Sequence, residues 1–239
     1  MISSEMTVRE VATQLPESTR LFETLKIDYC CGGHRSLTEA CASAGVEVDN
    51  VITELSALRK PATGDGAAID FQKLSLSELI THILETHHVF TKSEMVRIQA
   101  LAEKVIGVHG ANHPELLSVG ELFQRLCVDL SPHMFKEERV LFPYIVAMEQ
   151  SVTEGKPVPF APFGTVQNPV RMMMMEHDTA GDLLRKLREV ASQYQVPSDA
   201  CISYRTLYQA LENFEKDLHQ HIHLENNLLF PKAVERESH

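Results

Sequence analysis

A pattern that occurs twice, H-x3-E-x2 followed by Val or Leu and then L-F-P, constrains this chain more than any other feature. The two copies are residues 133–143 and 221–231, and they begin 88 residues apart. In an α-helix, positions i and i+4 project from the same face about one turn apart. Each copy therefore points an imidazole and a carboxylate in the same direction, as a pair of metal ligands would. A repeat of this kind also indicates a duplicated structural unit.

Two further histidines continue the repeat. His88 and His177 are 89 residues apart, and each lies about 45 residues before an HxxxE histidine. His87 is an alternative to His88, because either could continue the apolar stripe that precedes them. The repeat offset favours His88. The plan is therefore four helices, which carry in turn a histidine, an HxxxE pair, a histidine and an HxxxE pair.

Other histidines are weaker candidates for metal binding. His219 and His223 are also four residues apart, which suits a ligand pair, but both point away from the apolar stripe of their helix. We therefore expect them on the surface. His109 and His113 have no partner at a useful spacing, so we expect them in solvent.

The candidate ligands lie on the apolar faces of their helices. In the last helix, steps of three and four residues join the members of one stripe, which then reaches the second HxxxE pair: Leu207, Leu211, Phe214, Leu218, His221 and Glu225. Glutamate is almost never fully buried unless it is paired or binds a metal. Two buried glutamates among four buried histidines therefore predict bound cations.

The donor set predicts a dinuclear iron centre. Imidazole and carboxylate ligands without thiolate suit iron, manganese or zinc, whereas calcium and magnesium prefer oxygen ligands throughout. Six ligands are too many for one tetrahedral zinc ion, and helix bundles are the recurrent scaffold of di-iron and di-manganese sites. We predict two iron ions per chain with an oxo or hydroxo bridge, held by His88, His133, Glu137, His177, His221 and Glu225.

Two nearby acidic residues could support this centre. Glu176 precedes His177, and Asp129 lies four residues before His133. Each is a candidate to orient a ligand or to take up protons. The alternative is that both are ordinary acidic residues of a helix surface.

Composition excludes several classes of protein. No apolar run approaches the ~20 residues of a membrane span, and a net charge of −11 without a basic patch argues against nucleic acid as a partner. Residues 1–26 do not show the basic start and apolar block that are typical of an export signal, and the chain has an odd number of cysteines, five. We therefore expect the reducing cytoplasm as its compartment. Cys41, Cys127 and Cys201 are expected to be isolated small core residues.

The chain divides into two helical parts, and no alternating strand pattern is present. Capping boxes begin at Thr7 and Ser36, so residues 1–60 form a small helical domain. Residues 61–73 contain glycines and a proline and are interpreted as a linker. Residues 74–239 form an up-down four-helix bundle. Its helices are expected at 74–107, 115–150, 167–194 and 198–236.

The segment Asp28-Tyr-Cys30-Cys31-Gly-Gly33 contains adjacent cysteines. Adjacent cysteines can form only a strained disulfide, and strained disulfides tend to be labile and redox-active. The two glycines permit backbone conformations that other residues avoid. Cys30 and Cys31 could serve as a redox switch, as iron ligands or as a transfer point for nitric oxide. The alternative is that they are chance neighbours in a turn.

Over nearly its whole length the chain resembles the repair-of-iron-centres family, the di-iron proteins of the YtfE, ScdA and DnrN type. The resemblance rests on D-Y-C-C-G-G, the first H-x3-E with its L-F-P, Glu-His-Asp at 176–178, and H-x3-E-N-N-x-L-F-P. It implies a hemerythrin-like bundle, with the six positions above as iron ligands. It also implies a cytoplasmic homodimer that repairs iron–sulfur proteins damaged by nitrosative or oxidative stress.

The resemblance leaves the mechanism open. The di-iron centre could donate iron to a broken cluster, or it could bind and reduce nitric oxide, and the cysteines could serve either process. One alternative is a di-iron enzyme that turns over nitric oxide, and another is an oxygen- or nitric-oxide-binding sensor. Oxygen-carrying hemerythrins have a second histidine four residues after the one matched by His177, where this chain has Gly181. That difference makes the site more open and weakens the case for oxygen carriage.

Overall fold

The computed structural model of the chain describes residues 2–58 and 69–237. All regular elements in these ranges are helices, so the predicted all-α class is confirmed. Most of the predicted linker, residues 61–68, lies outside the described residues. Within the described ranges, no helix is both long and apolar enough to cross a membrane.

Four short helices form the N-terminal part: α1 (Val8–Gln14), α2 (Ser18–Leu25), α3 (Leu37–Ala44) and α4 (Val48–Leu58). The first and third begin at the predicted capping boxes. In α1, the Thr7 hydroxyl accepts from the Glu10 amide, and the Glu10 carboxylate accepts from the Thr7 amide. These bonds satisfy two amides that an isolated helix start would leave unpaired. The four helices enclose an apolar core of their own around Phe22, Leu37 and Leu55.

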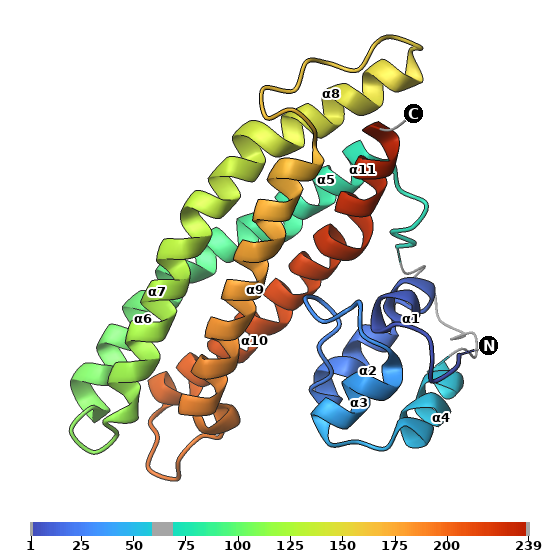
Figure 1. Cartoon of the computed structure of the whole chain (residues 1–239). Helices are drawn as coiled ribbons and strands as arrows, with labels where there is room; N and C mark the ends of the chain where they lie inside the picture. Colours follow the sequence, from blue (N-terminus) through green and yellow to red (C-terminus); the bar gives the residue numbers. More distant parts are fainter. Residues whose placement is uncertain (1, 59–68, 238–239) are drawn as a thin grey trace.

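The bundle consists of four long helical rods. Figure 1 shows their arrangement. The first is α5 (Leu76–His82), η1 (Ile83–His88) and α6 (Val89–His109), and the second is α7 (Glu115–Lys136), η2 (Glu137–Leu141) and α8 (Phe142–Thr153). The third is α9 (Gln167–Val190), followed by the 3-10 turn η3 (Ser192–Tyr194). The fourth is α10 (Ile202–Leu224), η4 (Glu225–Leu229) and α11 (Phe230–Glu237). The third rod ends earlier than predicted, because left-handed residues begin at Ser192.

Three of these rods contain a π-helical turn, and each turn touches a predicted ligand. The turn η1 ends at His88, η2 begins at Glu137, and η4 begins at Glu225. Pro143 and Pro231 lie just beyond η2 and η4. A proline has no amide to donate to the carbonyl four residues earlier, and that carbonyl lies inside the π turn in both cases. The L-F-P end of the repeated pattern therefore favours the local widening of the helix.

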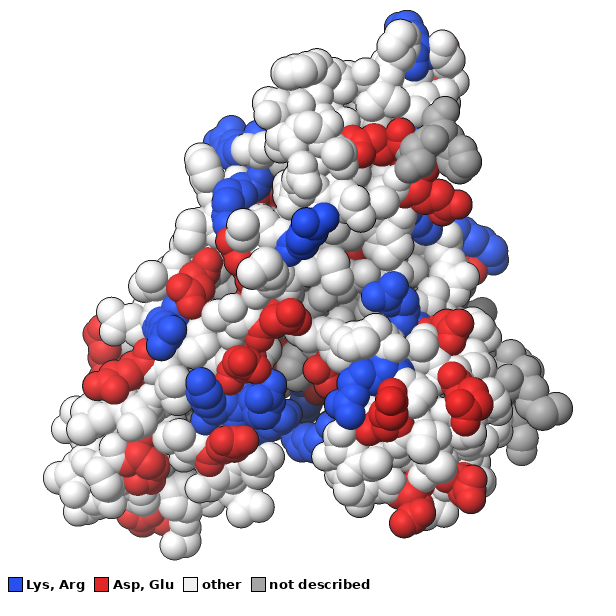
Figure 2. Space-filling view, in the orientation of Figure 1, with Lys and Arg blue, Asp and Glu red and all other residues white. Residues whose placement is uncertain are grey.

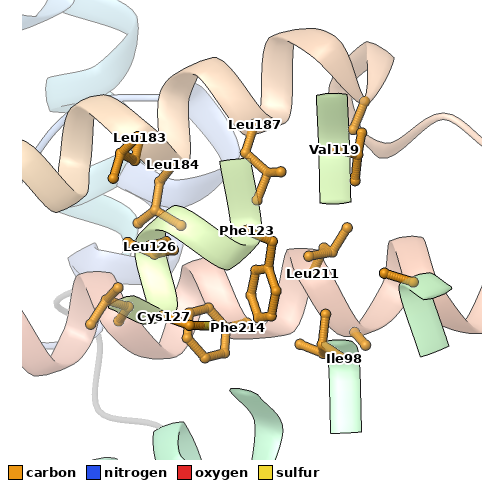
Figure 3. Packing of buried hydrophobic residues seen from close by; sticks show 14 of the residues in the cluster. Ile98, Val119, Phe123, Leu126, Cys127, Leu183, Leu184, Leu187, Leu211 and Phe214 are labelled. Atoms are coloured by element: carbon orange, nitrogen blue, oxygen red, sulfur yellow. The ribbon is translucent and has the colours of Figure 1, made fainter. Parts of the chain in front are cut away.

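The bundle core consists of two apolar clusters along its length. In one, Phe123 and Phe214 meet edge to face with ring centroids 5.3 Å apart, surrounded by leucines of α7, α9 and α10 (Figure 3). The other joins α5, α8, α11 and the start of α9 around Ile83, Phe142 and Phe230. In every rod the predicted ligands fall between the stretches that belong to these two clusters. The ligands thus form a polar layer between the two apolar clusters.

Candidate metal centre

Six side chains meet in the polar layer of the bundle, and all of them were predicted from the repeat. Their exposed fractions are 2% or less: His88, His133, Glu137, His177, His221 and Glu225. They come from all four rods, and the π turns carry three of them. Burial of two carboxylates and four imidazoles without solvent is strongly unfavourable unless the groups neutralise one another or bind cations.

The six side chains form two overlapping groups. One contains His88 and His221, the other contains His133 and His177, and Glu137 and Glu225 belong to both. Within each group one ligand atom per residue lies within 4.8 Å of the others. Each glutamate therefore faces two imidazole pairs at once, which is the geometry of a carboxylate between two cations. This ligand-to-site division was not predictable from the spacing of the sequence.

Several donor atoms of the six side chains have no hydrogen-bond partner in the layer, although all of them could bind a cation. His88 Nε2, both carboxylate oxygens of Glu137 and one oxygen of Glu225 are buried without a hydrogen-bond partner. His88 Nε2 lies 3.4 Å from Glu137 Oε2, close enough for attraction but without hydrogen-bond geometry. His133 and His177 point their Nε2 atoms at each other across 3.0 Å. Native proteins rarely leave so many buried polar atoms unpaired, so the set fits a pair of metal ions.

The pKa values of the side chains in the polar layer also favour bound cations. Burial alone would raise the pKa of the Glu225 carboxyl, but His221 and His177 hold that pKa well below its usual range. Burial also disfavours charge on His133, yet its carboxylate neighbours, chiefly Glu137, outweigh this and raise its pKa to about 10. The glutamates therefore stay ionised and require positive charge between them. Two divalent cations would supply that charge and satisfy the donors together.

Three side chains bind the outer nitrogens of the histidines. His88 Nδ1 lies 2.7 Å from Glu138 Oε1, His133 Nδ1 lies 2.8 Å from Glu176 Oε2, and His177 Nδ1 lies 2.8 Å from Asn226 Oδ1. Such bonds fix the ring orientation and the tautomer that presents Nε2 to a metal. Of these partners only Glu176 was predicted. Glu138 and Asn226 were missed, although each follows the glutamate of an HxxxE copy, which was the available signal.

The prediction for Asp129 needs correction. Its side chain is exposed and makes no hydrogen bond to a histidine in the described part of the chain. The reason is that Glu176, from the neighbouring helix α9, already takes the outer nitrogen of His133. Glu176 also forms an ion pair with Lys136. Hydrogen bonds from His133 and Lys136 lower the pKa of Glu176 to about 2.

We expected His219 and His223 on the surface, and this prediction was wrong. His223 is buried, and His219 is mostly covered with its Nδ1 atom 2.8 Å from Glu23 Oε1. The N-terminal part packs against this face of α10, which the helical pattern alone treated as solvent-facing. His87 is buried as well; it stacks on His221 and its Nδ1 atom lies 3.0 Å from Asp217 Oδ1.

Two predictions made for residues at the far end of the bundle also fail. His113 bridges Asp199 and Glu115 at about 3.0 Å rather than standing free in solvent. Cys201 is exposed before α10 rather than in the core, and its Sγ atom lies 3.1 Å from His109 Nε2. Both contacts join the α6–α7 turn to the α9–α10 connection, and such long-range neighbours cannot be read from local spacing.

The adjacent cysteines lie beside the polar layer of the six candidate ligands, here also called the metal layer, but they belong to neither group of ligands. Cys30 and Cys31 are free thiols with Sγ atoms 3.8 Å apart, and the Cys31 thiol lies 3.5 Å from the carbonyl oxygen of His177. Contact with Cys31, together with burial, raises the pKa of Cys30 well above its ordinary value. Asp28 Oδ1 accepts from the Cys30 and Cys31 amides at 3.1 and 3.0 Å. The turn is therefore held by a carboxylate from its own sequence.

The glycines after the cysteines are needed for close packing rather than for unusual backbone angles. Neither has a positive φ. A Cβ atom at Gly32 would lie 3.1 Å from the Asp28 carboxylate, and one at Gly33 would lie 3.1 Å from the side-chain oxygen of Asn227. Larger residues here would push the turn away from Asp28 and from the bundle.

The sequence matches two known families. Residues 79–233 match the hemerythrin HHE cation-binding domain, and residues 4–59 match ScdA_N, a domain of unknown function. The chain is 32% identical over 232 residues to the iron–sulfur cluster repair protein ScdA of Staphylococcus haemolyticus, which covers 97% of this chain and 99% of that protein. It is also 32% identical over 227 residues to the iron–sulfur cluster repair protein YtfE of Yersinia pseudotuberculosis, with coverages of 95% and 96%.

Proposed function

This chain belongs to the hemerythrin-like iron–sulfur cluster repair proteins, and from that membership we propose that it binds two iron ions and restores iron–sulfur clusters damaged by nitric oxide or oxidants. The observation that carries the proposal is the pair of buried His/Glu groups that share Glu137 and Glu225. Its clients are then iron–sulfur proteins. The odd number of cysteines supports the cytoplasm as its compartment.

In this proposal each iron has its own imidazole pair. His88 and His221 would hold one ion, His133 and His177 the other, with the two glutamates between them. When bound, the iron pair supplies transferable ferrous ions and open positions for nitric oxide or oxygen. Manganese or zinc would suit the same donor types, so the choice of iron rests on the family.

The surrounding residues would keep the imidazoles ready to bind. Glu138 and Glu176 accept the outer protons of His88 and His133, and Asn226 accepts that of His177. Each bond leaves the inner Nε2 lone pair directed at the polar layer. Glu176 and Glu138 also contact Lys136 and Lys92 at the edge of the bundle, and both are partly exposed, so each connects an outer histidine nitrogen with solvent.

Gly181 supports repair over oxygen carriage. It provides no seventh side-chain donor, and the Cys31 sulfur lies 3.4 Å from the place a Cβ atom would take there. We propose that Cys30 and Cys31 act in thiol redox chemistry next to the centre. A homodimer is expected from the resemblance to the family, and sedimentation of the full chain would test it.

The proposal is tested by rescue of a nitrosylated iron–sulfur enzyme. Iron-loaded protein, reduced under argon, should restore the activity of that enzyme. His133→Leu and Glu225→Leu should abolish rescue and lose iron, because each leaves buried charges without a partner. His109→Leu, at the far end of the bundle, is the matched control and should retain both. Rescue by metal-free protein, or Mössbauer and metal analysis that find zinc instead of coupled iron, would contradict the proposal.

The same preparation separates repair from enzymatic turnover of nitric oxide. A repair protein that captures nitric oxide should give at most one stoichiometric burst of nitrous oxide. Sustained production with added reductant would instead identify a nitric oxide-reducing enzyme.

A further inference from the structure

A large cleft lies between the N-terminal part and the bundle, outside the metal layer. Its volume is about 670 Å³, which is within the range that small-molecule sites occupy. One wall comes from α2, α3 and the segment that carries the cysteines, and the other from α9, η3 and α10. Figure 2 shows the hollow between the two parts, with Lys and Arg side chains gathered on both sides of it.

The charges of the two walls are complementary to a ligand that carries both signs. On the N-terminal wall, Lys26 and Arg35 form no ion pair with any carboxylate in the described ranges; Arg35 donates instead to Ser43 Oγ at 2.6 Å. On the bundle wall, Asp178 and Glu189 likewise form no ion pair within residues 2–58 and 69–237. The N-terminal wall also contains the carboxylate of Asp28, which accepts hydrogen bonds from the backbone amides of Cys30 and Cys31. Beside it, that wall offers two cations without an ion pair among the described residues, and the bundle wall offers two carboxylates without one. An amino group and a carboxylate group on one small molecule would satisfy both.

The bundle wall also contains two arginines, and each of them is already paired with a carboxylate. Arg188 Nη1 lies 3.1 Å from Glu215 Oε1, and Arg185 Nη2 lies 2.6 Å from Asp182 Oδ1. These pairs shape the wall but leave its free charge negative. A simple anion would therefore be attracted by one side of the cleft and repelled by the other, which argues against phosphate-type ligands.

The cleft also gives access to one sulfur of the cysteine pair. Cys31 lines it and is partly exposed, whereas Cys30 also borders it but is 95% covered and lies behind with its sulfur 3.8 Å away. A thiol bound in the cleft would meet Cys31 first. Exchange through Cys31 would then be completed by Cys30 from the protein side.

We propose that this cleft binds a zwitterionic low-molecular-weight thiol of tripeptide size, and that the bound thiol is the redox partner of Cys30 and Cys31. The proposal rests on the thiol redox role included in the proposed function and adds the chemical class of the electron donor. The disulfide form of the ligand exchanges with the Cys31 thiolate to give a mixed disulfide and one free ligand thiol. Attack by Cys30 on Cys31 then forms the protein disulfide and releases the second ligand thiol.

The reverse direction reduces the protein. Two ligand thiols convert the Cys30–Cys31 disulfide into two cysteine thiols and are themselves joined as the ligand disulfide. Two electrons and two protons move in either direction, and no other reactant is required.

Binding without exchange is measured first, with S-methylglutathione titrated into the iron-loaded full chain by calorimetry. We expect binding that Lys26→Gln and Arg35→Gln each weaken by about tenfold, since each removes a charge-assisted contact. Lys186→Gln, a cation of α9 outside the cleft, and Arg20→Gln, outside it on α2, are matched controls and should bind as the parent does. Equal affinity in all variants would overturn the site.

Exchange is measured second, with glutathione disulfide and rapid alkylation followed by mass analysis. The mixed disulfide should form at Cys31, and Cys30→Ser should trap it there. The disulfide of 2-mercaptoethanol, which lacks both charges, should react with Cys31 about tenfold more slowly under the same conditions. Equal rates for the two disulfides would mean that Cys31 reacts only because it is exposed to solvent, and they would overturn the proposal.

Iron content and cluster rescue with dithiothreitol are followed in the same variants. A parent chain that holds iron and rescues clusters but does not bind S-methylglutathione refutes the cleft proposal alone. A parent chain that binds S-methylglutathione but rescues no cluster refutes the proposed function alone.

Discussion

Glu138 and Asn226 occupy equivalent positions in the two copies of the repeat, directly after the shared glutamates. Each binds the outer nitrogen of the histidine carried by the preceding rod, but one is a carboxylate and the other a neutral amide. A carboxylate withdraws the ring proton more strongly and makes its histidine the more basic donor. Each metal position nevertheless has one histidine held by a carboxylate, because Glu176 binds the outer nitrogen of His133. The positions differ in their second histidine: His177 binds Asn226, whereas His221 Nδ1 is buried without a hydrogen-bond partner among the described residues.

Asn226 also connects the metal layer to the cysteine segment. Its side-chain oxygen accepts from His177 Nδ1 at 2.8 Å, and its amide nitrogen lies 3.4 Å from the Cys30 carbonyl. We expect Asn226→Ala to weaken metal binding by about 10- to 100-fold, the usual effect of losing such an outer contact. Competition with a chelator measures this. Asn213→Ala, at an exposed position of α10 in the same rod, should leave the affinity unchanged. Equal affinity in both variants would contradict the assignment.

At the level of single residues, periodicity predicted well which side chains face inward. The stripe of α10 leads to His221 and Glu225 because 3.6 residues per turn fixes a face irrespective of what covers it. The same reasoning failed for His223 and Asp129. Whether an outward side chain meets solvent or another part of the protein depends on distant elements.

Among the elements, the π-helical turns explain why the repeated pattern extends beyond its ligands. Pro143 and Pro231 each remove an amide that a regular helix would need, and the widened turn lies at the carbonyls left without it. The turns η2 and η4 begin at the shared glutamates. Local backbone geometry and ligand position are thus specified by one short stretch of sequence.

The contact of His113 with Asp199 and Glu115 ties the α6–α7 turn to the α9–α10 connection. These carboxylates raise the pKa of His113 above its ordinary value. Because the folded-state pKa is the higher one, the stabilisation is complete below about pH 6.5 and is lost as pH rises through the folded-state pKa.

We expect His113→Gln to lower the free energy of unfolding most at about pH 6 and least at about pH 9, the two sides of that transition. Denaturant unfolding of parent and variant at both pH values measures the difference. Asp199→Asn should show the same pH dependence, because it removes the first carboxylate partner. A difference that stays constant across this range would exclude the ion pairs as its cause.

At the scale of the whole molecule, the N-terminal part is attached to the bundle at η4, beside the metal layer. Arg9 Nε donates to Asn227 Oδ1 at 2.7 Å, and Asn227 Nδ2 donates to the Tyr29 carbonyl at 2.9 Å. Asn227 is the second residue after the shared Glu225. Residues at the two ends of the chain therefore hold the cysteine segment against the centre.

We expect Arg9→Ala to loosen this attachment and to speed alkylation of Cys30 by about tenfold or more, because a hydrogen bond to a charged group contributes about 1.5–3 kcal/mol. Timed alkylation with mass analysis measures the rate. The iron content of the bundle should not change. Arg20→Ala, exposed on α2, is the control, and Cys30 rates that are equal in the two variants would refute the role of Arg9.

The four-rod plan, the six inward-facing ligands and the small helical part that carries the cysteines could all be predicted from the amino-acid sequence. Each of these follows from short-range periodicity, capping residues or a repeat offset, all of which act along one helix. Three features became visible only in the packed fold: which histidines share a metal position, which side chains bind their outer nitrogens, and where the cleft beside Cys31 lies. These features depend on distances between separate helices, and those distances are set by packing rather than by local spacing.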